Sequence, residues 1–161
     1  MNSPVITASA LGLTRNESGR RFPHSEDAGA LEAVRAEILE ILTGGTWEQA
    51  WRVYDLDGMT TVEIDHLVER GLMTPTFADT AGAGRGFAVY GEGEASLEIN
   101  GDDHLRLLAF RPGGQLAYLW SLLNRLDDRL EMVVSYAFDP RWGYLTARPK
   151  QAGSGMRAYA T

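Results

Sequence analysis

Apolar residues recur at helical spacing in two stretches of the first half of the chain. Between residues 25 and 45 one helical face carries Leu31, Val34, Ile38, Ile41 and Leu42. This pattern predicts an amphipathic helix, with Ser25 as a candidate N-cap and Gly44 as its stop. A shorter helix is predicted in "TTVEIDHLVERG", where Gly71 can supply the left-handed turn that ends it.

The central part of the chain alternates between apolar and polar residues, as strands do. Strands are predicted in "GFAVYG", "ASLEING" and "HLRLLAF", and "EGE" closes a hairpin between the first two. A further strand is predicted in "WGYLTA". The stretch "TPTFADTAGAGRG" is small and polar, and it is predicted to be a loop.

A long helix is predicted between the last two of these strands. In "GGQLAYLWSLLNRLDDRLEMVV" leucines recur at spacings of three and four, at Leu116, Leu119, Leu123, Leu126 and Leu130. The elements together predict one α+β domain over residues 1–161, with an antiparallel sheet flanked by helices. The sheet is expected to carry residues near 86–110 and 143–148, with the helix near 113–131 packed on one face.

The composition fits an ordinary globular domain and narrows the function classes. The 161 residues are 44% hydrophobic and 23% charged, and the net charge of -7 argues against a non-specific binder of nucleic acid or of anionic membranes. There is no cysteine, and the three histidines make no spaced ligand set, so no structural metal is expected. The N-terminus lacks a signal-like pattern and no run approaches the roughly 20 apolar residues of a membrane span, so we expect a soluble cytoplasmic protein.

Charged residues interrupt the predicted sheet at residues 100–106, which read Asn-Gly-Asp-Asp-His-Leu-Arg. This stretch resembles the Asn-Glu-Glu-Asp-His-Leu-Arg hallmark of the ATP:guanido phosphotransferases, with identity at five of the seven positions. The resemblance extends, in the expected order, through "TRNESGRRFP", "HLVERGLMTP", "LNRLDDRLE", "YAFDPRWGYLTARP" and "GSGMRA". Within the family, the chain is most similar to the bacterial protein-arginine kinases. The resemblance implies part of the guanido kinase catalytic domain as the fold.

The resemblance also implies a reaction, in which the terminal phosphoryl group of MgATP is transferred in line to a guanidinium nitrogen. Such a site needs arginines that bind the phosphates and a carboxylate that aligns the guanidinium and accepts its proton. By position, Asp102 matches the catalytic carboxylate, and Arg106 and Arg157 match phosphate-binding arginines. Ser9, which lies within the stretch that matches a Ser-x-Arg-x-Arg motif, is assigned to the nucleotide site. ATP and Mg²⁺ are the implied cofactors.

Two other residues of the matching motifs are expected to be structural. Arg15 falls on the arginine of an Arg-Asn pair in the family, whose role is expected to be structural or peripheral, and His104 is expected to be buried and hydrogen-bonded. Without the resemblance, Asp102, Arg106 and Arg157 would be read as surface ion pairs or charges at a sheet edge.

Several positions depart from the family pattern. Ala10 and Gly12 stand where the motif has its two arginines, Gly71 replaces a histidine that contacts the nucleotide, and Arg148 replaces a reactive cysteine. Asp102 is one methylene shorter than the family's glutamate. The loss of two cations alone could lower the rate on the order of a thousandfold. Beyond "RAYAT" the family has more sheet and a further arginine-bearing loop, so the sequence reads as a truncated and degenerate copy with little or no catalysis.

Three hypotheses remain open from the sequence. The chain could be an active, diverged or split protein-arginine kinase, with the phosphate clamp rebuilt from Arg20, Arg21 or Arg111. It could be a non-catalytic module that binds a nucleotide, a phosphoarginine protein or a kinase partner. It could also be a remnant whose exposed sheet edge pairs with a missing half.

Overall fold

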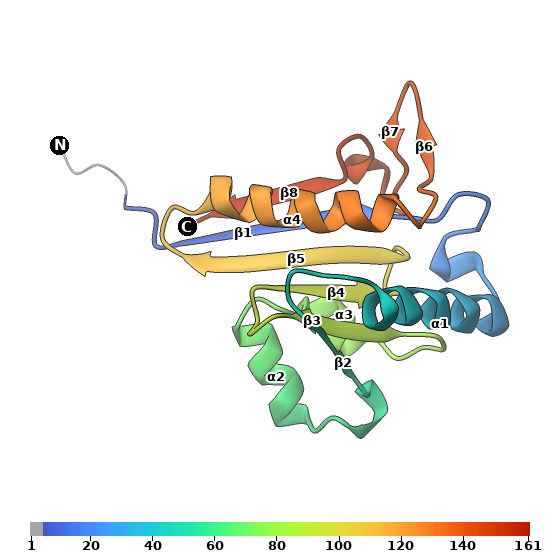
Figure 1. Ribbon diagram of the computed structural model, residues 1–161, viewed down its shortest axis with the longest axis horizontal. Helices are drawn as coiled ribbons and strands as arrows, with labels where there is room; N and C mark the ends of the chain where they lie inside the picture. The colour runs from blue at the N-terminus through green and yellow to red at the C-terminus, as the bar shows by residue number, and fades with distance from the viewer. Residues whose placement is uncertain (1–4) are drawn as a thin grey trace.

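A six-stranded antiparallel sheet forms the centre of the computed structural model, which describes residues 5–161 (Figure 1). In spatial order the strands are β2 (Trp51–Tyr54), β3 (Gly86–Tyr90), β4 (Ala95–Ile99), β5 (Leu105–Pro112), β1 (Ala8–Arg15) and β8 (Met156–Ala160). Every neighbouring pair is antiparallel. The predicted α+β class is therefore confirmed, and so are the strands at 86–110.

Helices cover both faces of this sheet, and the sheet separates the buried core residues into two clusters. One face packs against α1 (Ala28–Gly44) and α4 (Leu116–Glu131), whose buried side chains include Ile38 and Leu123. The other face packs against α2 (Thr61–Glu69) and α3 (Pro75–Asp79), through Leu67 and Phe77. Alternate residues of β3 serve the two clusters, Ala88 and Tyr90 the first and Phe87 and Val89 the second, as the pleat of a sheet requires. Within residues 5–161, no helix is both long and apolar enough to cross a membrane.

The predicted helices occur, with one correction to a cap. Asp27, and not Ser25, caps α1, because the Asp27 carboxylate accepts a hydrogen bond from the backbone N–H of Ala30 at 2.9 Å. Ser25 belongs instead to a short 3-10 helix, η1 (Pro23–Ser25). The helix α1 ends at Gly44, as expected. The predicted role of Gly71 after α2 is also confirmed, since its φ is +69°.

Two other predictions about secondary structure were wrong. Residues 143–148 do not join the central sheet, because β7 (Gly143–Tyr144) pairs with β6 (Phe138–Asp139) in a separate two-stranded sheet. The stretch predicted as a loop contains α3, which is started by a Thr74 side-chain cap and by Pro75 in its first turn. Two more 3-10 helices, η2 (Leu56–Gly58) and η3 (Pro149–Gln151), complete the described elements.

Candidate functional site

The loop that joins β4 to β5 carries the charged residues 100–104. Asn100 begins it with a positive φ of 55°, a conformation that asparagine tolerates better than most residues. Its side-chain amide donates hydrogen bonds to the carbonyl oxygens of Leu31 at 2.8 Å and of Gly84 at 2.6 Å. The loop is thus tied at its start to α1 and to the segment before β3.

A buried network ties the same loop to the end of β1 and to residues 145–147. One Asp103 carboxylate oxygen accepts hydrogen bonds from the Asn16 side chain at 2.8 Å and from the backbone N–H of Ala147 at 2.6 Å. Asn16 also donates to the carbonyl of Leu145 at 3.0 Å and accepts from the backbone N–H of His104 at 2.9 Å. Segments that are far apart in sequence therefore meet at fixed positions around Asp102.

His104 is a structural part of this loop. Its imidazole is fully buried, and Nδ1 accepts a hydrogen bond from the backbone N–H of Glu17 at 3.1 Å. Burial, reinforced by the positive charge of Arg20, lowers the pKa of His104 to about 4. The ring is therefore neutral near pH 7, which agrees with the structural role expected from the sequence.

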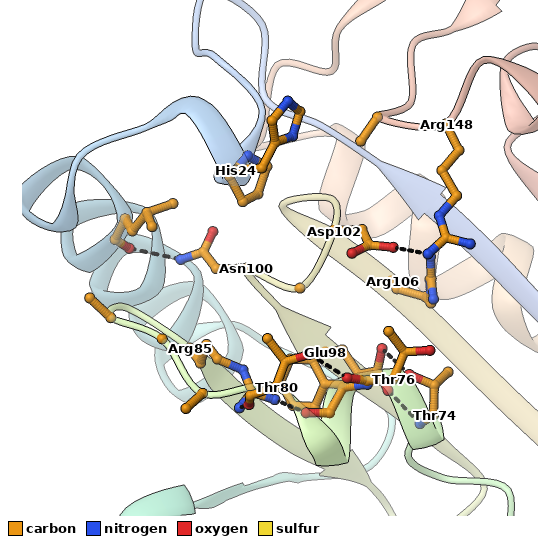
Figure 2. Close-up of a pocket in the computed structure, with 18 residues that line it drawn as sticks. His24, Thr74, Thr76, Thr80, Arg85, Glu98, Asn100, Asp102, Arg106 and Arg148 are labelled. Atoms are coloured by element: carbon orange, nitrogen blue, oxygen red, sulfur yellow. Dashed lines mark hydrogen bonds and ion pairs between the residues drawn. The ribbon is translucent and has the colours of Figure 1, made fainter.

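Asp102 faces a cavity of about 430 Å³ that opens between this loop, α3 and the segment before η3 (Figure 2). Its carboxylate forms an ion pair with Arg148, with 2.7 Å between Oδ2 and Nη2. Arg106 lines the same cavity and lies 3.8 Å from Asp103. The structure thus brings Asp102 and Arg106 to one cavity, and it adds Arg148, the residue that replaces the family's cysteine.

Glu98 is a further carboxyl group in this cavity, and the sequence analysis missed it. The side chain is only 3% exposed, and it accepts hydrogen bonds from the Thr74 backbone N–H at 2.6 Å and from the Thr74 hydroxyl at 3.2 Å. Burial raises the pKa of Glu98 to about 7, although the bonds from Thr74 and the charge of Arg106 oppose the rise. The sequence feature that could have identified Glu98 is a lone glutamate inside the apolar strand "ASLEI".

Arg106 and Arg157 meet at a second cavity, of about 270 Å³, on the sheet face that carries α2. They lie on β5 and β8, which flank β1, and their cross-strand partners on β1 are Thr14 and Gly12. Cross-strand partners project to the same face of a sheet, so the two arginines border the part of β1 that carries Gly12 and Thr14. Arg106 lines both cavities, as Thr74 does. The role of these arginines in nucleotide binding stays a prediction.

Ser9 lies away from these arginines. Its hydroxyl is buried, donates to the Gly113 carbonyl at 2.7 Å and accepts from the Gln115 backbone N–H at 3.0 Å, so it fastens the turn between β5 and α4. By strand alternation it projects to the face of Leu11 and Leu13, opposite Ala10. Ser9 lines neither cavity, and its assignment to the nucleotide site stays a prediction.

Arg15 is structural as well. Its guanidinium is buried, forms an ion pair with Asp127 at 2.6 Å and lies 3.7 Å from the centre of the Tyr144 ring. Arg20, Arg21 and Arg111, the candidates for a rebuilt clamp, line neither cavity. Arg20 pairs with Glu17 and Glu37, and Arg111 stacks over Tyr118 at 4.1 Å.

Comparisons with known proteins agree with the motifs. The family model described as ATP:guanido phosphotransferase, C-terminal catalytic domain matches residues 33–160. The protein-arginine kinase of Halothermothrix orenii is 34% identical over 154 residues, which cover 96% of this chain and 44% of that protein. The protein-arginine kinase of Geobacillus stearothermophilus is 33% identical over 159 residues, with 98% and 44% covered. The chain thus spans less than half the length of these relatives.

Solved structures give the same fold. The duplicated taurocyamine kinase of Schistosoma mansoni matches with a TM-score of 0.86 at 23% identity, over 99% of this chain and 24% of that one. A lombricine kinase matches with a TM-score of 0.82 at 21% identity, over 97% of this chain and 47% of that one. With the model of the C-terminal catalytic domain matched over residues 33–160, the chain belongs to the ATP:guanido phosphotransferase family.

Proposed function

We propose that this chain is a protein-arginine-kinase-like domain that binds MgATP weakly and, in isolation, transfers little or no phosphoryl group to arginine. The family match and the relatives named protein-arginine kinase support the reaction class. The observation that carries the proposal is the position of Arg106 and Arg157 on either side of β1, whose residues Ala10 and Gly12 line the same cavity.

Weak nucleotide binding follows from counting the cations at this cavity. Arginine binds phosphate oxygens through a planar pair of N–H donors, and these charge-assisted bonds are among the strongest that proteins make. Arg106 and Arg157 supply such donors, whereas Ala10 and Gly12 supply none. A triphosphate would therefore be neutralised only in part, and its affinity would be low.

The missing arginines are not easily restored. A Cβ atom added at position 12 would lie 3.3 Å from Cδ2 of Leu108, so a long side chain there requires Leu108 to move. A chain with both Ala10→Arg and Gly12→Arg would still have the shorter carboxylate at Asp102 and the cation at Arg148. We therefore expect no rescue of phosphoryl transfer by these two substitutions alone.

The acceptor side of the site centres on Asp102. In this proposal its carboxylate aligns the guanidinium and accepts a proton from it. Its side chain is one methylene shorter than the family's glutamate, and misplacement by about 1 Å can cost on the order of a hundredfold in rate. Positioning would therefore be poor even with ATP bound.

ATP would supply the phosphoryl group, and the residues of the chain fit Mg²⁺ only as a metal that arrives with it. Within residues 5–161 no group of three or more potential metal-ligating side chains gathers. Mg²⁺ in phosphoryl-transfer sites commonly keeps several waters and binds substrate phosphates with one or two carboxylates. The part of this chain would be to orient the phosphates through Arg106 and Arg157.

A second candidate function is association with a partner, and the edge of the sheet favours it. All five residues of β8 are exposed, and β8 is the last strand in the sheet order. An open edge presents unpaired backbone groups to which another strand can add. A kinase partner would bind there, and kinase activity would then appear only in the complex.

Calorimetry with MgATP tests the nucleotide half of the proposal. Weak binding is expected for the unchanged chain and loss of detectable heat for Arg106→Ala and for Arg157→Ala. Arg111→Ala is the matched control, because Arg111 also lies on β5 but lines neither cavity. Undiminished binding in both site variants would remove these arginines from the nucleotide site.

A further inference from the structure

The carboxylate assigned to the substrate guanidinium already holds a guanidinium from the same chain. Nη2 of Arg148 lies 2.7 Å from Oδ2 of Asp102, and both side chains line the cavity of about 430 Å³ (Figure 2). This is the charge-assisted contact that an incoming arginine would make with Asp102. An external guanidinium and Arg148 therefore compete for one carboxylate.

The backbone around Arg148 is held in place for this contact. Asp103, the neighbour of Asp102, accepts the backbone N–H of Ala147 at 2.6 Å. The Thr146 hydroxyl donates to the Arg148 carbonyl at 2.7 Å. Pro149 follows Arg148 and restricts it to extended backbone, as its φ of -102° and ψ of 111° show. The guanidinium thus needs to order only its own side chain to reach Asp102.

We infer that Arg148 is a specificity-determining residue that acts as an intramolecular competitor of guanidinium ligands at Asp102. The inference rests on the proposed function, because it takes Asp102 as the acceptor-side carboxylate. Arg148 competes with a ligand in two ways: its charge repels a second guanidinium, and its Nη2 donates to the Asp102 oxygen that a ligand would use.

The competitor is one that a ligand can displace. The Arg148 side chain is 56% exposed and that of Asp102 is 35% exposed, so water screens their attraction. Because exposed ion pairs are weak, we expect the removal of Arg148 to improve guanidinium binding by about two- to fivefold, not by orders of magnitude. Arg148 therefore raises the ligand concentration needed to occupy the site, but it does not close the site.

The test is an NMR titration of the ¹⁵N-labelled chain with N-acetyl-L-arginine amide, in the absence of nucleotide, at low ionic strength. Arg148→Ala is expected to bind about two- to fivefold more tightly than the unchanged chain. Arg141→Ala is the matched control, because it removes an exposed arginine that lies outside this cavity, and it is expected to bind like the unchanged chain. In the double variant Asp102→Asn with Arg148→Ala, the gain is expected to disappear.

Each other outcome overturns the inference, and the outcomes separate it from the proposed function. If the unchanged chain and Arg148→Ala bind with equal affinity, and if Asp102→Asn abolishes binding in both backgrounds, Asp102 stays the acceptor site and Arg148 is rejected as its competitor. A gain that survives Asp102→Asn would place the binding elsewhere. Absence of binding in every variant would reject the Asp102 site itself, and with it the acceptor half of the proposed function.

Discussion

Glu98 on β4 and Arg106 on β5 are cross-strand partners, so a buried carboxyl and a phosphate-site candidate share one face of the sheet. The pKa of Glu98 is raised from 4.5 to about 7, chiefly by burial. The folded protein therefore binds more protons at this site than the unfolded chain between roughly pH 4.5 and 7. The contribution of Glu98 to the free energy of unfolding is full below pH 4.5 and is lost as the pH rises toward 7.

The substitution Glu98→Gln tests this linkage, because glutamine resembles the protonated carboxyl and does not titrate. The unfolding free energy of Glu98→Gln, minus that of the unchanged chain, is expected to rise between pH 5 and pH 8, by up to about 3 kcal/mol. Urea unfolding at both pH values measures it. His104 titrates in an overlapping range with the opposite sign, but it is common to both proteins and cancels in the difference. A difference independent of pH would show that Glu98 is ionised throughout this range.

Gly71 is expected to tolerate no side chain, including the histidine of other family members. Its φ is +69°, and an added Cβ would lie 2.8 Å from Cβ of Phe110. Both the left-handed backbone and the clash oppose the change, so Gly71→Ala should lower the free energy of unfolding by more than about 1 kcal/mol. Gly44→Ala is the control, since an added Cβ there meets nothing within 4 Å. Equal stability of Gly71→Ala and Gly44→Ala would contradict the placement of Gly71.

The buried pair of Arg15 and Asp127 is expected to be important for stability. Both residues are less than 5% exposed, and two Arg15 nitrogens donate to one Asp127 oxygen, at 2.6 and 3.2 Å. Removal of one partner leaves an uncompensated buried charge, so Asp127→Ala should cost about 3–5 kcal/mol. Thermal unfolding measures this loss of stability, with Asp128→Ala, a change at an exposed position of the same helix, as the control. A similar loss in the two variants would exclude this role for the pair.

The sequence predicted the elements with a strong period. The leucines of α4 recur every three or four residues, and β3, β4 and β5 were found between clear turn signals. It missed β8, a five-residue strand whose alternating positions hold mostly small alanines, and β1, whose small residues Ala10 and Gly12 weaken the pattern. The short α3 was missed because five residues are too few to show a period.

The site was predictable only where a motif marks it. Motif matches selected Asp102, Arg106 and Arg157, and the structure places Arg106 beside both cavities. The contact of Asp102 with Arg148 was not predictable, because the residues are 46 positions apart and are brought together by the bonds of Asp103 and Asn16. Ser9 follows a motif, yet its hydroxyl fastens a turn. A motif match therefore predicts where a residue lies on a strand, but it does not predict what its side chain contacts.

The most direct test of the account is a phosphoryl-transfer assay on the isolated chain. Labelled MgATP is incubated with the chain and an arginine-rich unfolded protein, and acid-labile phosphate on the acceptor is measured. We expect no more than trace transfer by the unchanged chain, and none added by the double variant Ala10→Arg with Gly12→Arg. Robust turnover that is abolished by Asp102→Ala would contradict this account and identify the chain as an active, diverged protein-arginine kinase.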